Sequence, residues 1–454
     1  NGSIVVSDQQ NNRVRLIRSV GTVFSLTGIY IVSLDGSERY RFSDNGRHLD
    51  TTNTYTGASL YSFGYDTEGR LTSITDRDGR IMTIDYSALP SKIIAPTMDE
   101  TTFRLDTEGF LQSVTNPAGE TVVLDYYPGG LLRTYTDARH NDSLLFYDGL
   151  GYLERYKDRA GHILTLEREA LANGHRITKR KGRRSWTYGV IFMDSGELSL
   201  VNEDYAGRST TVRRLPDGET VITYPTGVEE RISLAPDPRW GMAAPFEELH
   251  TMMNPSGAAF TAATTRTVEL TDPFDPMSLE RFTETKTFNG MHAWTTNHDI
   301  ASGRYALSYP DGREAVTFLD ATGRVTQGEQ RPGLTPVIVV RGDPEHPGRP
   351  LRLEQEDLRV IYDYDGTGRL RYVTNAAGDR TEYGYDLAGR MTGVTTPEGH
   401  FVEHRYDANG NMEMLVMPDM EEHTLSYTRI NRLSGYIPPG GTGLSKRYDE
   451  QGLP

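Results

Sequence analysis

The clearest charge feature of this 454-residue chain is a basic run at residues 179–184, Lys-Arg-Lys-Gly-Arg-Arg. Such a run could contact an anionic partner or be cut by a protease. A hairpin turn around Gly182, with Lys and Arg at strand edges where they discourage aggregation, explains the same residues more simply, because the run is short and the chain is acidic. We therefore interpret residues 179–184 as structural.

Two further groups have the residue types of metal ligands. Residues 407–411, Asp-Ala-Asn-Gly-Asn, resemble the start of a calcium loop, but the Gly is misplaced and Pro418 stands where the bidentate Glu should be. His292 and His298 are six residues apart, and no partner has a zinc-like spacing. Turn chemistry explains residues 407–411, and we predict no metal site.

The chain also lacks patterns that would indicate catalysis. Glu229 and Glu230 are adjacent, so on a strand they point to opposite faces, which is the wrong geometry for an acid and base that cooperate. Neither a nucleophile elbow nor a phosphate loop is present. The chain has no Cys, which excludes disulfides, thiolate metal sites and a Cys nucleophile. We predict that the protein is not an enzyme and has no cofactor.

Composition points to strands and turns. The chain has 26 Tyr against 14 Phe, which favours strands, while 46 Gly and 23 Pro supply turns. The net charge of −15 disfavours nucleic acid as a partner. No apolar run approaches the roughly 18–20 residues that span a membrane. The absence of Cys argues against a disulfide-stapled animal ectodomain and favours a secreted or cell-surface bacterial protein.

A repeat of 21 residues dominates the second half of the chain. Asp365, Asp386 and Asp407 are 21 residues apart, and the same step leads on to Thr428 and Asp449. The motif residues are Tyr364, Asp365, Gly368 and Arg369; Tyr385, Asp386, Gly389 and Arg390; Tyr406, Asp407 and Gly410; Tyr448 and Asp449; and, in the first half, Tyr65, Asp66, Gly69 and Arg70. This regular spacing predicts a repeat architecture.

Each repeat unit is predicted to form a strand, a tight turn and a second strand. The Asp can accept a hydrogen bond from the backbone two residues on, and the Gly supplies the positive φ that a tight hairpin needs. Tyr383 and Tyr385 alternate with other residues and so share one face of a strand. One unit cannot bury its apolar face alone, so neighbouring units must join into a continuous antiparallel sheet. The predicted fold class is therefore all-β.

The pattern Tyr-Asp-x-x-Gly-Arg-Leu resembles the YD repeat of the Rhs family, which includes bacterial Rhs toxins, the BC cage of Tc toxins and the teneurins. The resemblance covers residues 28–235 and 300–454. It implies a β-strand ribbon that spirals into a hollow shell, of which this chain holds a part. In the bacterial members the shell encloses a C-terminal toxin domain. The Asp-Pro-x-Gly segment that the family associates with self-cleavage is not found, so no cleavage residues are transferred.

Residues 1–17 resemble the last blade of an NHL propeller, although an ordinary β-hairpin explains them equally well. The predicted organisation is a propeller-like end at 1–20, a first YD block at 21–235, an irregular insertion at 236–300 and a second YD block at 301–454. We expect the chain to be a fragment of a longer protein.

Two functions stay open. The first is a shell that encloses its own C-terminal toxin or cargo together with the remaining shell segments, with no nucleic acid partner and no membrane span. The second is a teneurin-like adhesion protein that contacts a cell-surface protein or a glycan. Exposed Tyr rows could bind sugars, but cross-strand aromatic pairing is the simpler explanation of the repeated Tyr.

Overall fold

The computed structural model describes residues 4–8, 13–17, 29–87, 91–343 and 346–449. Within these ranges every regular element is a β-strand, and none of these residues lies in a helix. No described segment is therefore a helix long and apolar enough to cross a membrane. The predicted all-β fold class is confirmed.

The strands of the first half are β1 (Ile4–Asp8), β2 (Arg13–Ile17), β3 (Ile29–Val32), β4 (Glu38–Phe42), β5 (His48–Asn53), β6 (Ser59–Tyr65), β7 (Leu71–Asp76), β8 (Ile81–Asp85), β9 (Ser91–Ile94), β10 (Glu100–Leu105), β11 (Leu111–Thr115), β12 (Thr121–Tyr126), β13 (Leu132–Thr136), β14 (Asp142–Tyr147), β15 (Leu153–Lys157), β16 (Ile163–Leu171), β17 (Gly174–Lys181), β18 (Arg184–Phe192), β19 (Leu198–Glu203) and β20 (Ser209–Arg214). Those of the second half are β21 (Thr220–Thr223), β22 (Glu229–Asp237), β23 (Gly241–Met253), β24 (Ala259–Leu270), β25 (Leu279–Phe288), β26 (His292–Asp299), β27 (Arg304–Ser308), β28 (Glu314–Leu319), β29 (Val325–Arg331), β30 (Val337–Val340), β31 (Arg352–Gln355), β32 (Leu358–Tyr364), β33 (Leu370–Thr374), β34 (Arg380–Tyr385), β35 (Met391–Thr395), β36 (Phe401–Tyr406), β37 (Met412–Val416), β38 (Glu422–Tyr427), β39 (Leu433–Ile437) and β40 (Leu444–Ser445).

The chain divides into two compact units, each made of segments that are far apart in the sequence. Unit 1 consists of Asn1–Ile81, Arg213–Arg341 and Leu353–Asp357, and unit 2 of Met82–Val212, Gly342–Arg352 and Leu358–Pro454. The four-part organisation predicted from the sequence follows the repeat pattern rather than these contacts, and its boundaries stay a prediction.

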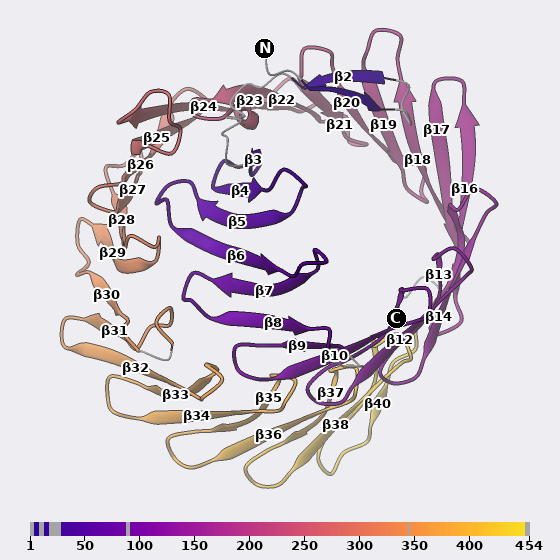
Figure 1. Cartoon of the computed structure of the whole chain (residues 1–454), viewed down its shortest axis with the longest axis vertical. Helices are drawn as coiled ribbons and strands as arrows, with labels where there is room; N and C mark the ends of the chain where they lie inside the picture. The colour runs from indigo at the N-terminus through magenta and orange to yellow at the C-terminus, as the bar shows by residue number, and fades with distance from the viewer. Residues whose placement is uncertain (1–3, 9–12, 18–28, 88–90, 344–345, 450–454) are drawn as a thin grey trace. The chain divides into compact units, whose positions relative to one another are not determined.

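Within each unit the strands form antiparallel meanders, in which each strand pairs with its neighbours in the sequence (Figure 1). In unit 1 the meanders run from β3 to β7 and from β21 to β30. In unit 2 they run from β8 to β19 and from β32 to β40. The predicted antiparallel ribbon is thus present in both units.

A β-bulge precedes the Tyr of each complete repeat turn. Gly384 pairs with Gly393, whereas the next residue, Tyr385, pairs with Met391, so Thr392 is the extra residue of the ladder. The same shift occurs before Tyr65, Tyr126, Tyr147, Tyr364, Tyr406 and Tyr427. A bulge increases the local twist and changes the direction of the side chains beside it.

Buried apolar side chains are concentrated in unit 1. Among the described residues nine hydrophobic side chains are buried, and eight of them lie between Val221 and Val316. Among the described residues of unit 2, Val416 is the one buried hydrophobic side chain. Unit 2 therefore depends more on hydrogen bonds and ion pairs between strands and turns than on a packed interior.

The prediction of an irregular segment at 236–300 is wrong, because β22 to β26 cover most of it as paired strands of 8 to 13 residues. Its prolines explain the error. Pro236 lies where the β22–β23 register shifts between Ala235 and Asp237, a position at which Pro removes no ladder hydrogen bond.

At the N-terminus β1 pairs with β2, with Ile4 opposite Ile17 and Asp8 opposite Arg13. This hairpin agrees with either interpretation of residues 1–17. Residues 1–3 and 9–12 lie outside the described residues, and the resemblance to a propeller blade stays a prediction.

Candidate functional site

The Asp and Gly of each repeat close its turn, as Asp386 and Gly389 illustrate. One Asp386 oxygen accepts the Arg390 backbone N–H at 2.9 Å, and the other accepts Nε of the same arginine at 2.7 Å. The Gly389 N–H donates to the Asp386 carbonyl at 3.0 Å, and Gly389 has a φ of 80°. A side chain at that φ would be strained, so the turn requires Gly.

These turn hydrogen bonds favour the charged form of the repeat carboxylates. Burial opposes ionisation of Asp365, but hydrogen bonds from the Thr367 hydroxyl and from the backbone and guanidinium of Arg369 outweigh it, and they hold the pKa at about 2. The pKa of Asp66 is also lowered, chiefly by its hydrogen bond from the Arg70 side chain. The repeat turns therefore stabilise the fold only while their Asp residues are ionised.

We expect the protein to lose stability when the pH falls from about 4 to about 2. The folded pKa of Asp365 lies below its ordinary value, so its contribution is complete above that value and disappears as the pH falls through the folded pKa. The midpoint of urea denaturation, measured at several pH values between 7 and 2, tests this prediction. Asp365→Asn should show a shallower acid loss than the wild type, and equal slopes would contradict the argument.

The Tyr of each YD repeat connects that repeat to the preceding repeat of the ribbon. The Tyr385 hydroxyl donates to the Leu370 carbonyl at 2.8 Å, and the Tyr406 hydroxyl donates to the Met391 carbonyl at 2.8 Å. Four further Tyr hydroxyls donate in the same way to the carbonyl 15 residues earlier, those of Tyr126, Tyr147, Tyr427 and Tyr448. The hydroxyls of these Tyr rows are thus engaged within the sheet.

The Arg of each YD repeat connects that repeat to the following repeat of the ribbon. Arg390 Nη1 donates to the Asp407 carbonyl at 3.2 Å, and its guanidinium lies 5.2 Å from the centre of the Tyr406 ring. In the same way, Arg369 Nη1 donates to the carbonyl of Asp386 in the following repeat at 2.9 Å. Tyr, Asp and Arg thus form a continuous polar connection along the ribbon.

We expect Tyr385→Phe to lower the free energy of unfolding by about 1 kcal/mol, because it removes one internal hydrogen bond and leaves the Leu370 carbonyl without its donor. Urea denaturation measures the loss. Tyr383→Phe is the matched control, since the Tyr383 hydroxyl makes no hydrogen bond to another described group, and it should change stability little. Equal losses for the two variants would refute the role of the hydroxyl.

In unit 2 the hairpin turns of two distant segments interlock through polar groups, a contact that we call the unit 2 seam. Its residues are Glu120, Asp137, Arg139, Arg159, Arg390, Asp407, Asn409, Tyr427 and Thr428. Asp137 lies at its centre with only 3% of its side chain exposed, 2.5 Å from Arg159 Nη1 and 2.8 Å from the Asn409 amide nitrogen. Burial raises the pKa of Asp137, but donors from Asn141, Asn409 and Arg159 outweigh it and lower the pKa overall.

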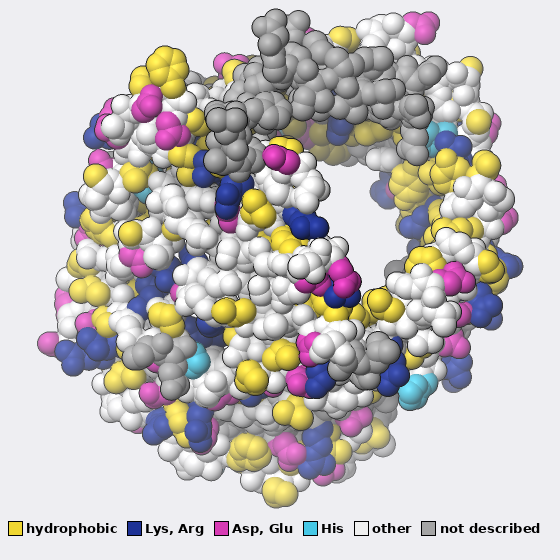
Figure 2. All heavy atoms as spheres, viewed as in Figure 1, with side chains coloured by type: hydrophobic (Ala, Val, Ile, Leu, Met, Phe, Trp, Pro, Cys, Tyr) yellow, Lys and Arg dark blue, Asp and Glu magenta, His cyan; other side chains and the backbone are white. Residues whose placement is uncertain are grey.

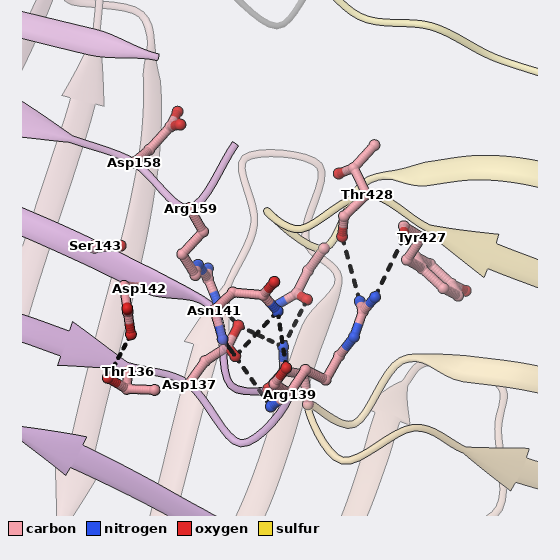
Figure 3. Close-up of polar contacts among 12 residues, drawn as sticks. Thr136, Asp137, Arg139, Asn141, Asp142, Ser143, Asp158, Arg159, Tyr427 and Thr428 are labelled. Atoms are coloured by element: carbon pink, nitrogen blue, oxygen red, sulfur yellow. Dashed lines mark hydrogen bonds and ion pairs between the residues drawn. The ribbon is translucent and has the colours of Figure 1, made fainter. Parts of the chain in front are cut away.

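Arg139 extends the unit 2 seam to the β38–β39 turn, as Figure 3 shows. It comes from the turn between β13 and β14 and donates to the Thr428 carbonyl at 3.3 Å and to the Tyr427 carbonyl at 3.4 Å. It also lies 3.3 Å from the Asp407 carboxylate. On the other side of the seam Arg390 pairs with Glu120 at 2.8 Å. These contacts therefore join two turns of the first segment, β11–β12 and β13–β14, to three turns of the second, β34–β35, β36–β37 and β38–β39.

Unit 1 has a similar contact between β7–β8 and β28–β29. Arg324 pairs with Asp78, and Arg77 Nη1 donates to the Thr322 carbonyl at 3.3 Å. In both units the joined residues are 245 to 289 positions apart in the sequence. The repeat pattern predicts these turns but does not show that turns of distant segments contact one another. The one signal in the sequence that could have suggested this contact is the alternation of Asp, Asn and Arg at both edges of the ribbon.

The basic run at residues 179–184 forms the β17–β18 hairpin, with Gly182 in its turn. Lys179 lies 5.1 Å from the Trp186 ring centre, and Arg184 lies 4.5 Å from that of Tyr205. Arg180 pairs with Glu167, and Lys181 lies 3.8 Å from the Asp158 carboxylate. Contacts within the sheet thus occupy most of these charges, which supports the structural interpretation.

The groups with metal-like residue types are not brought together. The Asp407 carboxylate accepts backbone N–H groups from Asn409 and Asn411, as a turn requires. His298 is buried on β26, whereas His292 is exposed at the start of that strand. The part of the chain that the structure describes holds no cluster of three or more metal-ligating side chains.

A family model described as "Teneurin YD-shell" matches residues 27–454. This chain belongs to the teneurin YD-shell family. The resemblance to YD-repeat proteins is thereby confirmed, and with it the assignment to a family of shell-type scaffolds.

Teneurins are also found among curated proteins. Teneurin-1 of Gallus gallus is 26% identical over 248 residues, which cover 54% of this chain and 9% of that protein. Teneurin-1 of Homo sapiens is 28% identical over 244 residues, with 52% and 9% covered. Teneurin-3 of Danio rerio is 34% identical over 98 residues, with 21% and 4% covered. The chain spans less than a tenth of the length of these relatives.

Solved structures of toxin complexes are similar in part. A chain of the Photorhabdus luminescens Tc holotoxin pore matches with 13% identity and a TM-score of 0.41, over 88% of this chain and 23% of that one. A chain of a TcdB2-TccC3-TEV crystal structure matches with 12% identity and a TM-score of 0.34, over 91% and 24%. The chain spans about a quarter of the length of each.

Proposed function

We propose that this chain forms part of the wall of a hollow β-shell that encloses a polypeptide cargo, such as a C-terminal toxin domain, and that it acts mechanically and not as an enzyme. The observation that carries this proposal is the unit 2 seam. A ribbon one sheet thick exposes its hairpin edges, and charged groups such as Asp137 and Arg139 join those edges between distant segments. Joined edges are what a wall without gaps needs.

The surface chemistry agrees with a scaffold. Figure 2 shows Lys and Arg side chains interspersed with Asp and Glu across the face that it draws, without a broad basic field. Such a surface does not favour nucleic acid. In this proposal the protein is bacterial and works outside the cell, secreted or at the surface, and its partners are its own cargo and the remaining shell segments.

The test uses the full-length protein together with its proposed cargo domain. Its cargo should resist protease while the shell is intact and become cleavable in an Asp137→Ala variant, which opens the seam. Asp125→Ala is the matched control, because Asp125 pairs with Arg133 on the surface, with about half of each side chain exposed. Cargo that is cut in the intact protein as fast as free cargo would overturn the proposal.

A second candidate is a teneurin-like adhesion protein that uses the shell as a rigid scaffold for a cell-surface protein or a glycan. The observation in its favour is that the curated relatives reported above are all teneurins. Specific binding of the purified chain to cell surfaces, lost after protease treatment of the cells, would support a protein receptor. A protein that protects a cargo and binds no cells would exclude this candidate.

A further inference from the structure

His298 is a buried histidine at the place where the turn after β5 packs against strands β25 to β27 of unit 1. It is 4% exposed, and in the ladder it lies opposite Phe282 of β25 and Tyr305 of β27. A pocket of about 380 Å³ lies beside the β5 turn, and Tyr55 and His298 are part of its lining. Because the ring of His298 lines this pocket, water and protons can reach it.

Tyr55 connects the β5 turn to these strands through ring contacts. Its ring centre lies 5.8 Å from that of Phe282 and 5.6 Å from that of His298. The rings of His298 and Tyr305 are 5.7 Å apart. Ring pairs at these distances stabilise a contact through packing and through the match of ring edges to ring faces. The contact between the β5 turn and strands β25 to β27 thus depends on the ring of His298.

The surroundings of His298 suit the neutral ring and not the charged one. The ring makes no hydrogen bond or ion pair with another described group of the chain. A protonated imidazole carries two N–H donors and a charge, and burying them without partners costs free energy. Burial therefore lowers the pKa of His298, while the Asp299 carboxylate raises it and the Arg239 guanidinium lowers it, each by less than burial does.

Two guanidinium groups near His298 add to the cost of a proton on its ring. Arg239, from the turn between β22 and β23, lies 4.8 Å from the Tyr55 ring centre. Arg266 of β24 lies 5.7 Å from the Phe282 ring centre. Both rings therefore already face a cation, and a second cation gains little from them.

The carboxylates around the pocket are engaged with other groups. Arg266 holds two of them, with Nε 2.6 Å from Glu284 and Nη1 3.3 Å from Asp237. Asp35 of the β3–β4 turn lines the pocket and accepts hydrogen bonds within its own turn.

Two further carboxylates lie close to His298 and also have their own partners. Asp299 follows His298 directly, so the two side chains point to opposite faces of β26, and Asp299 lies 3.5 Å from Arg281. Asp320 of the β28–β29 turn lines an adjoining pocket with His298 and accepts the Arg324 backbone N–H at 3.0 Å. None of these carboxylates is placed to pair with a proton on His298.

We propose that His298 is a pH-sensitive switch in unit 1: its neutral ring holds the β5 turn against strands β25 to β27, and uptake of a proton at mildly acidic pH loosens this contact. Once the contact opens, water can solvate the charged ring, so the open form binds the proton more strongly than the closed form. The contact is therefore most stable above the ordinary His pKa of about 6.5, and it weakens as the pH falls from there toward the lower pKa of the closed form. The proposal goes beyond the shell function, because it concerns unit 1 alone and needs no cargo.

Hydrogen exchange by mass spectrometry on the 454-residue chain, at about pH 7.0 and about pH 5.5, tests the proposal. Rates are divided by those of unstructured peptides at the same pH, because exchange itself depends on pH. Peptides from residues 53–58 and from β25–β27 should lose protection about five- to tenfold at the lower pH, since opening exposes one group with a pKa of about 6.5. Peptides from β13–β15 in unit 2 should keep their protection, because this range lies above that in which the repeat Asp residues lose their charge.

His298→Phe keeps a ring but cannot bind a proton, so its protection should be equal at the two pH values. His298→Gln serves the same purpose if the Phe variant does not fold. His292→Gln is the control, since His292 is exposed on the same strand, and it should keep the wild-type loss.

An NMR titration of the wild-type His298 ring should give a midpoint below about 6.5. The proposal is overturned if that midpoint lies at or above the ordinary value, if wild-type protection does not change with pH, or if a neutral variant of His298 keeps the loss. Protease protection of the cargo at neutral pH does not depend on any of these results, so failure here leaves the shell proposal to its own test.

Discussion

Asp137→Ala is expected to lower the free energy of unfolding by about 3 kcal/mol, with the loss concentrated in unit 2. The Asp137 carboxylate is buried and receives Arg159 at 2.5 Å and the Asn409 amide at 2.8 Å. It also accepts the Asn141 backbone N–H at 2.8 Å inside its own turn. Its removal leaves these donors, one of them charged, without an acceptor in a place that water reaches poorly.

Urea denaturation measures the total loss, and hydrogen exchange by mass spectrometry locates it. Peptides from β13–β15 and from β36–β38 should exchange faster in Asp137→Ala, while peptides from β23–β25 in unit 1 keep their protection. Asp125→Ala removes an exposed carboxylate from an ion pair and should cost under about 1 kcal/mol. Similar losses for the two variants would show that the seam is not a stabilising contact.

Trp240→Ala should cost about 3–5 kcal/mol, mainly in unit 1. Trp240 lies in the turn between β22 and β23 and is only 5% exposed. It packs closely against the β3–β4 turn, where a Cβ on Gly36 would stand 3.2 Å from Trp240 Cδ1. The neighbouring Ala244 is fully buried, so truncating the indole opens a cavity in the part of the chain with most buried apolar side chains.

The comparison variant is Trp294→Ala, because Trp294 belongs to the same unit but is 37% exposed. Its truncation removes a contact with Tyr309, at 4.8 Å between ring centres, and opens no enclosed cavity. Thermal and urea unfolding should show a loss less than half that of Trp240→Ala. If the exposed tryptophan proved equally costly, the packing of Trp240 against the β3–β4 turn would not be a main source of stability.

The role of the repeat Tyr was less predictable than that of Asp and Gly. Alternation places Tyr385 on a strand face, which favoured cross-strand aromatic pairing as its role. In the structure its hydroxyl reaches the Leu370 carbonyl, and the Arg369 guanidinium lies 5.2 Å from its ring centre. The bulge between Gly384 and Tyr385 accompanies this arrangement. Alternation assumes a regular ladder, and here the pairing shifts between Gly384 and Tyr385 because β35 contains the extra residue Thr392.

The sequence by itself determined the repeat, its turn chemistry and the all-β class, because each depends on residues within one 21-residue unit. Asp386, Gly389 and Arg390 interact across only four positions, so their spacing contains the structural information. The tertiary structure alone decided which turns meet, and thus the unit 2 seam and the pocket beside the β5 turn of unit 1. Asp137 and Asn409 are 272 positions apart, and their contact depends on twist accumulated over many strands, which no local pattern specifies.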